Sequence, residues 1–141
     1  MSLSLVSIYL ELVAVGTGKA ARYGACAILT CGERVKAAGQ YLGIHPSRAG
    51  ATGAATRLAL DALTRPCAVW VYSNTVVRSQ KQKSLFDRPG VEWVYISPGS
   101  YYRERAAYWA AYEIALGGEV TDAILELAVK AEDASRKLIA C

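Results

Sequence analysis

The chain has 141 residues, 53% of them hydrophobic and 20% charged, which excludes a disordered protein and fits one domain with a buried core. The formal net charge of +4 permits a nucleic-acid partner but does not require one. The apolar opening run contains Glu11, has no basic leader and is shorter than a membrane span. We therefore expect a cytoplasmic protein with no membrane partner.

The first third of the chain predicts an antiparallel meander of three strands. Runs rich in Leu, Val, Ile and Tyr are separated by glycine-containing turns, as strands joined by hairpins require. The expected elements are a strand at Ser4–Val15, a turn at Gly16–Arg22, a strand at Tyr23–Cys31, a hairpin at Gly32-Glu33 and a strand at Arg34–Leu42.

Helices and strands alternate in the rest of the chain. His45-Pro46-Ser47 breaks the meander, and Ser47 is a candidate N-cap for a helix over Arg48–Leu63. Gly50 and Gly53 each cost that helix roughly 1 kcal/mol, so we expect it to approach the sheet closely. The later expected elements are a buried strand at Cys67–Tyr72, a polar helix or loop at Asn74–Leu85, a strand at Val91–Ile96, and helices at Ser100–Leu116 and Glu119–Ile139.

This order, together with several short segments, resembles the type 1 ribonuclease H family from Leu10 to about Leu116. The segments that carry the resemblance are Leu10–Gly18, Tyr23–Leu29, Ala37–Gly39, Ala54–Leu63, Tyr72–Thr75 and Val91–Val94. The resemblance implies an α/β fold of the ribonuclease H type, with a mixed five-stranded sheet of three antiparallel strands plus parallel strands, flanked by helices. Residues 1–118 would form this domain, and residues 119–141 an extra C-terminal helix that packs on the domain or dimerises.

The chemistry of the family needs four carboxylates around two divalent metal ions. Carried over by position, the four acids become Val15, Thr52, Asn74 and about Ala107. None of these side chains carries a negative charge, and we expect Glu11, Glu33 and Asp61 to lie away from the site. The resemblance therefore predicts no catalytic residue, no metal ion, no cofactor and a protein that is not an enzyme.

Basic residues in the first turn, in the first helix and after the fourth strand are candidates for holding a nucleic-acid backbone. These residues are Lys19, Arg22, Arg48, Arg57, Arg78, Lys81, Lys83 and Arg88. The alternative is an ordinary solvated rim, and the sequence favours neither. Tyr101, Tyr102, Tyr108, Trp109 and Tyr112 either stack on bases or pack a helix against the sheet.

The last predicted helix carries an apolar heptad seam, which either packs on its own domain, as a lone amphipathic helix usually does, or forms a homodimer. The seam consists of Val120, Ile124, Leu127, Ala131, Ala134 and Leu138.

Cysteines stand at positions 26, 31, 67 and 141 without a Cys-x-x-Cys pair, and His45 is the only histidine, which argues against zinc. The single Asn and three Gln are typical of a thermophile, where a Cys67–Cys141 bridge is conceivable.

The residues argue against a dinucleotide-binding site and against a catalytic histidine. Gly16–Ala21 matches half of a dinucleotide fingerprint, but the next strand leaves no room for the helix that the fingerprint needs. His45 beside Pro46 is a loop or cap residue rather than a catalytic base.

The sequence thus predicts a non-catalytic protein that binds RNA, DNA or their hybrid. The alternatives are a protein-interaction scaffold and an enzyme with relocated chemistry.

Overall fold

The computed structural model describes residues 4–44, 47–73, 90–98 and 106–140. Its elements, in chain order, are β1 (Ser4–Val15), the 3-10 turn η1 (Gly18–Ala20), β2 (Arg22–Cys31), β3 (Arg34–Ile44), α1 (Arg48–Asp61), β4 (Cys67–Ser73), β5 (Val91–Pro98), α3 (Ala106–Gly117) and α4 (Asp122–Ala140).

The strands form one mixed sheet in the order β3-β2-β1-β4-β5. β2 pairs antiparallel with both β1 and β3, whereas β4 pairs parallel with both β1 and β5. The predicted α/β fold with a mixed sheet is confirmed. β1 is the strand at which the antiparallel and parallel halves meet.

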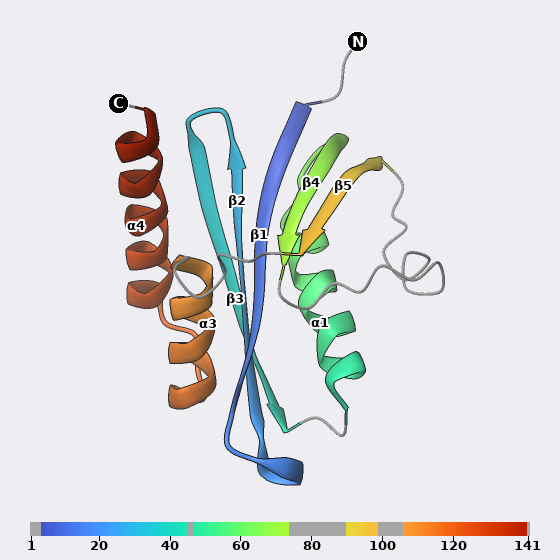
Figure 1. Cartoon of the computed structure of the whole chain (residues 1–141), viewed down its shortest axis with the longest axis vertical. Coiled ribbons are helices and arrows are strands. Elements are labelled where there is room, and N and C mark those ends of the chain that lie inside the picture. The colour runs from blue at the N-terminus through green and yellow to red at the C-terminus, as the bar shows by residue number, and fades with distance from the viewer. Residues whose placement is uncertain (1–3, 45–46, 74–89, 99–105, 141) are drawn as a thin grey trace.

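Helices cover both faces of the sheet, with α1 on one side and α3 and α4 on the other (Figure 1). Alternate residues of β1 pack against the two helix layers, because successive side chains of a strand point to opposite faces of the sheet. Leu10 and Leu12 pack with Ala55 of α1, while Val13 packs with Ala110 of α3.

Local signals account for where the helices begin. The Ser47 side chain accepts a hydrogen bond from the Gly50 backbone N–H at 3.2 Å, which confirms the predicted N-cap of α1. The hydroxyl oxygen of Thr121 accepts from the Ile124 N–H at 3.2 Å in the same way, so α4 begins at Asp122 rather than at Glu119.

The expected close approach of α1 to the sheet at Gly53 is wrong. A Cβ added to Gly53 would meet nothing within 4 Å. The close approach lies at Gly24 of β2, where an added Cβ would overlap the carbonyl oxygen of Ala111 and lie 2.5 Å from the amide nitrogen of Ala115. The small residue therefore lets α3 rest directly on β2.

The inner face of α4 differs from the predicted seam. Ala128 is fully buried in the cluster that joins α3 to the sheet, while Leu127 is 53% exposed and Ala131 is exposed. α4 packs along β3 and α3 of its own chain. The homodimer through this helix stays a prediction. Within the ranges given above, no helix has both the length and the hydropathy to cross a bilayer.

Candidate functional site

The carboxyl end of β4 stops beside the middle of β1. Ser73, the last residue of β4, pairs with Leu10, and β1 then continues to Val15 alongside β2 alone. Sites in open α/β sheets gather at the carboxyl ends of parallel strands, so this junction is the place to look for one. Asn74, which follows Ser73 in the chain, lies outside the described residues.

Glu11 is the charged side chain that β1 brings to this junction. It follows Leu10 in the strand and is only 2% exposed. It stands opposite Cys26 of β2, whose pKa rises to about 12, first because burial disfavours the thiolate and second because the Glu11 carboxylate repels it.

The register places Glu11, rather than Val15, next to the residue of β1 that pairs with the end of β4. Val15, the predicted equivalent of the first family acid, pairs with Arg22 at the far end of β1. A signal for Glu11 was present in the sequence, because a carboxylate within an otherwise apolar strand is rarely buried without a specific role.

The other predicted acid positions are neutral or lie outside the described residues. Thr52 is 6% exposed on α1, and its carbonyl oxygen accepts a hydrogen bond from the Thr56 hydroxyl at 2.9 Å. Ala107 is fully buried in the first turn of α3, in the same cluster as Cys26. Within the described ranges, no three His, Cys, Asp or Glu side chains come together to hold a metal ion.

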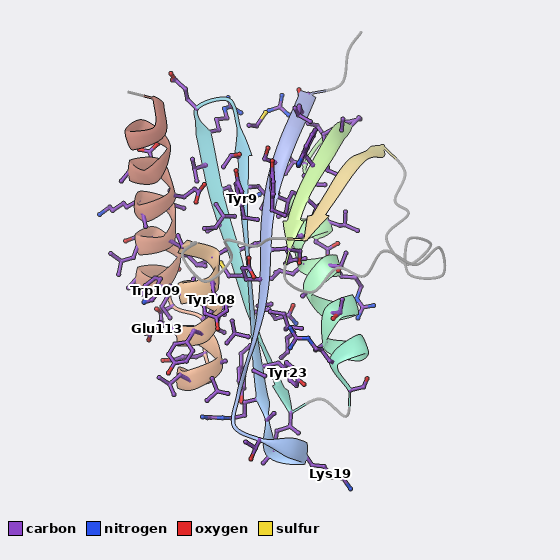
Figure 2. The ribbon with its side chains drawn as sticks, in the orientation of Figure 1. Tyr9, Lys19, Tyr23, Tyr108, Trp109 and Glu113 are labelled. Atoms are coloured by element: carbon purple, nitrogen blue, oxygen red, sulfur yellow. The ribbon has the colours of Figure 1, made fainter. Side chains whose placement is uncertain are left out.

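An aromatic group, absent from the predicted site, lies on the same face of the sheet as Glu11. The Tyr9 ring stacks on Tyr72 of β4, with centroids 5.1 Å apart and planes 14° apart. Trp70 extends the row, 6.4 Å from Tyr72. All three rings are half-buried. Figure 2 shows Tyr9 in the upper half of β1. Only the β1–β4 register could reveal this row, because Tyr9 and Tyr72 are far apart in the sequence.

The helix aromatics separate into two groups. Tyr108 packs against the sheet-side cluster, as the packing alternative expects. Trp109 and Tyr112 are 39% and 42% exposed. Tyr101 and Tyr102 lie outside the described residues.

Three of the predicted basic residues gather at the end of the molecule where β1 turns into β2. Lys19 is exposed in η1, and Arg22 is the first residue of β2. Arg22 pairs with Ile44 of β3, and Arg48, the first residue of α1, follows Ile44 by four residues. Figure 2 shows Lys19 at the tip of this turn, pointing away from the sheet. We call Lys19, Arg22 and Arg48 the basic end.

The remaining predicted cations do not join the basic end in the described structure. Arg57 is exposed on α1, but nine residues after Arg48 it lies two and a half turns along, on the opposite side of the helix. Arg78, Lys81, Lys83 and Arg88 lie outside the described residues, as do His45 and Cys141. The predicted Cys67–Cys141 bridge therefore stays a prediction.

No known protein family and no curated protein matches the sequence. Two solved structures match the fold with a TM-score of 0.52 each. LC9-RNase H1, a type 1 RNase H with the type 2 active-site motif, is 14% identical, and the match covers 96% of this chain and 85% of that chain. RNase H1 from the halophilic archaeon Halobacterium salinarum NRC-1 is 15% identical, with 82% and 99% covered.

A third structure, LC11-RNase H1 in complex with RNA/DNA hybrid, is 18% identical over 64% of this chain and 84% of that chain, with a TM-score of 0.41. The first two likenesses establish a ribonuclease-H-like fold, as the sequence predicted.

These neighbours contradict the prediction that the chain is not an enzyme, because the proteins that share its fold are RNases H1. The prediction rested on neutral residues at the four positions carried over from the family acids: Val15, Thr52, Asn74 and about Ala107. In the structure, the buried Glu11 follows Leu10, the residue that pairs with the last residue of β4.

Proposed function

We propose that this chain binds nucleic acid, with the phosphate backbone lying over the basic end and running toward the carboxyl end of β4. Backbone phosphates are held chiefly by Lys and Arg side chains, whatever the base sequence. RNA, DNA and the RNA–DNA hybrid are all ligands of this chemistry, and the test compares them.

The observation that carries the proposal is the one-sided charge of the basic end. Between Leu12 and Leu60 the only acidic residue is Glu33, and it lies in the β2–β3 hairpin at the other end of the strands. Lys19, Arg22 and Arg48 therefore have no acidic neighbour from the meander or from α1. The positive charge that the meander and α1 place at this end therefore favours the approach of a phosphate backbone from this side.

The ribonuclease-H-like fold supports the same proposal. RNase H1 from Halobacterium salinarum NRC-1 and LC9-RNase H1, two proteins named as RNases H1, have this fold. The half-buried Tyr9, Tyr72 and Trp70 rings at the junction of β1 and β4 are candidates for contact with bases.

Fluorescence anisotropy with labelled single-stranded DNA, duplex DNA, RNA and RNA–DNA hybrid tests the proposal. We expect binding that weakens steeply between about 50 and 200 mM salt. Lys19→Ala and Arg48→Ala should each lower the slope of log K against log salt by about 1. Lys130→Ala, an exposed cation on α4, is the matched control and should leave the slope unchanged. Absence of binding to all four ligands at about 50 mM salt would refute the proposal.

A second candidate function is hydrolysis of the bound strand, and the position of Glu11 favours it. A buried carboxylate beside the end of β4 could contribute to metal-dependent phosphodiester chemistry. The described residues supply this one carboxylate, fewer than a two-metal centre needs, so they do not by themselves fit such a centre. Incubation of the hybrid with purified protein in Mg²⁺ or Mn²⁺, and separately with a chelator, tests for cleavage.

A further inference from the structure

A pocket of about 570 Å³ opens at the end of the sheet opposite to the basic end. It lies between the first residues of β1 and β4, the β2–β3 hairpin and the segment that joins α1 to β4. Its volume falls in the range of small-molecule sites, roughly 300 to 1,000 Å³. It is formed by other residues than the basic end, so it is a separate place on the molecule.

Positive charge dominates the rim of this pocket. Arg34 and Lys36 come from β3 and Arg65 from the α1–β4 segment, while Glu33 is the only acidic residue among the lining residues that the structure describes. All three cationic side chains are exposed. Among the described residues, neither Arg34 nor Arg65 takes part in an ion pair. Two exposed arginine side chains therefore line the pocket.

Lys36 connects two walls of the pocket. Its Nζ donates a hydrogen bond to the carbonyl oxygen of Ala62 at 3.0 Å, from β3 to the C-cap of α1. An ammonium group has three donors, so two others remain for a ligand. This bond links β3 to the end of α1 across the pocket.

The floor of the pocket is apolar. Val6, Leu29 and Cys67 are 9%, 6% and 1% exposed and belong to the cluster that packs α1 on the sheet. Leu63 packs on the same cluster and lines the pocket. The pocket thus combines an uncharged floor with a cationic rim.

We propose that this pocket binds a nucleoside diphosphate. Arginine guanidinium groups pair with phosphate through two parallel hydrogen bonds and also stack on flat aromatic rings. The apolar floor suits the base, and the rim of Arg34, Lys36 and Arg65 suits the phosphates. A bare inorganic anion would fill only the rim and leave the floor uncovered.

Isothermal titration calorimetry with ADP and with inorganic phosphate, in buffers stripped of metal ions, tests the proposal. ADP should bind more tightly than inorganic phosphate by tenfold or more. Arg34→Ala and Arg65→Ala should each weaken ADP binding by roughly tenfold, the usual loss for a charged hydrogen-bonding partner. Lys130→Ala, on the far layer, is the matched control. No heat with millimolar ADP, equal affinity for phosphate, or unchanged ADP affinity in both arginine variants would each overturn it.

A second measurement needs no substitution and so does not depend on how the variants fold. Cys31 is half-buried in the pocket wall, and its alkylation by iodoacetamide can be followed by peptide mass spectrometry. ADP should slow alkylation of Cys31 in the native protein, whereas an unchanged rate at saturating ADP would contradict the site.

The two proposals fail separately. Arg34→Ala and Arg65→Ala should retain nucleic-acid affinity in the anisotropy assay, and Arg48→Ala should retain ADP affinity. Loss of ADP and nucleic-acid binding together in Arg65→Ala would place both ligands on one surface and overturn the separate pocket.

Discussion

Glu11 and Cys26 stand opposite one another in the antiparallel pairing of β1 and β2, both almost completely buried. Burial raises the pKa of the Cys26 thiol to about 12, and the neighbouring carboxylate adds to the rise. The thiol is therefore protonated and unreactive at neutral pH, while the carboxylate lies where β4 ends. One strand pair thus holds an inert thiol and a candidate functional acid side by side.

The raised pKa of Cys26 predicts a loss of stability in alkali. The folded protein keeps this proton up to about pH 12, whereas the unfolded chain releases it near pH 9. The contribution of the protonated Cys26 thiol to the free energy of unfolding is fully present below pH 9. It is lost as the pH rises from 9 towards 12, at about 1.4 kcal/mol per pH unit. Urea unfolding at pH 8, 9 and 10 measures this slope. Cys26→Ala should flatten it, and parallel curves for the two proteins would contradict the assignment.

Gly24 and Gly53 predict opposite effects of the same substitution. Gly24→Ala forces a Cβ into the backbone of α3 at Ala111 and Ala115, so we expect a loss of about 3 kcal/mol or more in the free energy of unfolding. Gly53→Ala meets open space in a helix and should gain about 0.5 to 1 kcal/mol. Chemical denaturation measures both changes, and a mild effect of Gly24→Ala would mean that α3 lies farther from β2.

Adjacent residues of α4 test how this helix packs. Ala128 is fully buried and Leu127 is 53% exposed. Ala128→Leu should therefore lower the free energy of unfolding by about 1 to 3 kcal/mol through overpacking. Leu127→Gln should stay within about 0.5 kcal/mol of the parent. Sedimentation velocity on the Leu127→Gln protein checks the predicted homodimer in the same experiment, because a dimer held by this face should dissociate.

Glu11→Gln tests the second candidate function. If the chain cleaves RNA–DNA hybrid in Mn²⁺, the substitution should reduce the rate at least a hundredfold, because an amide cannot replace a charged metal ligand. Glu33→Gln in the hairpin is the matched control and should retain the rate. Hybrid affinity measured in chelator should survive both substitutions. A cleavage rate that Glu11→Gln leaves unchanged would assign any nuclease activity to another site.

Local patterns located most of the elements. The strand at Ser4–Val15 has its predicted bounds, because its dense Leu, Val and Ile content ends at Gly16. The hairpin at Gly32 was also predictable, since its φ of +59° suits glycine. The predicted helix at Arg48–Leu63 extends two residues beyond the observed end of α1 at Asp61, because the proline that signals its end, Pro66, comes five residues later.

The site was harder to predict because it depends on pairing between distant segments. Whether Val15 or Glu11 lies beside the end of β4 follows from the β1–β4 register, which no turn between the two strands sets. The Tyr9–Tyr72 stack and the pocket at Arg34 and Arg65 likewise join segments that are far apart in sequence. Residue types could nominate these side chains, but only the tertiary register brings them together.

The central position of β1 has a consequence for the order in which the chain assembles. β1, β2 and β3 are joined by short turns, so their pairing closes small loops, whereas β4 reaches β1 only after α1 has crossed the sheet. Because closing longer loops costs more chain entropy, we expect the meander to form early and the parallel half to dock later. Amides at the β1–β2 pairing should then exchange with deuterium more slowly than those of β4. Glu11 would then lie in the antiparallel half of the sheet, which unfolds last. The end of β4 beside it would lie in the parallel half, which unfolds first.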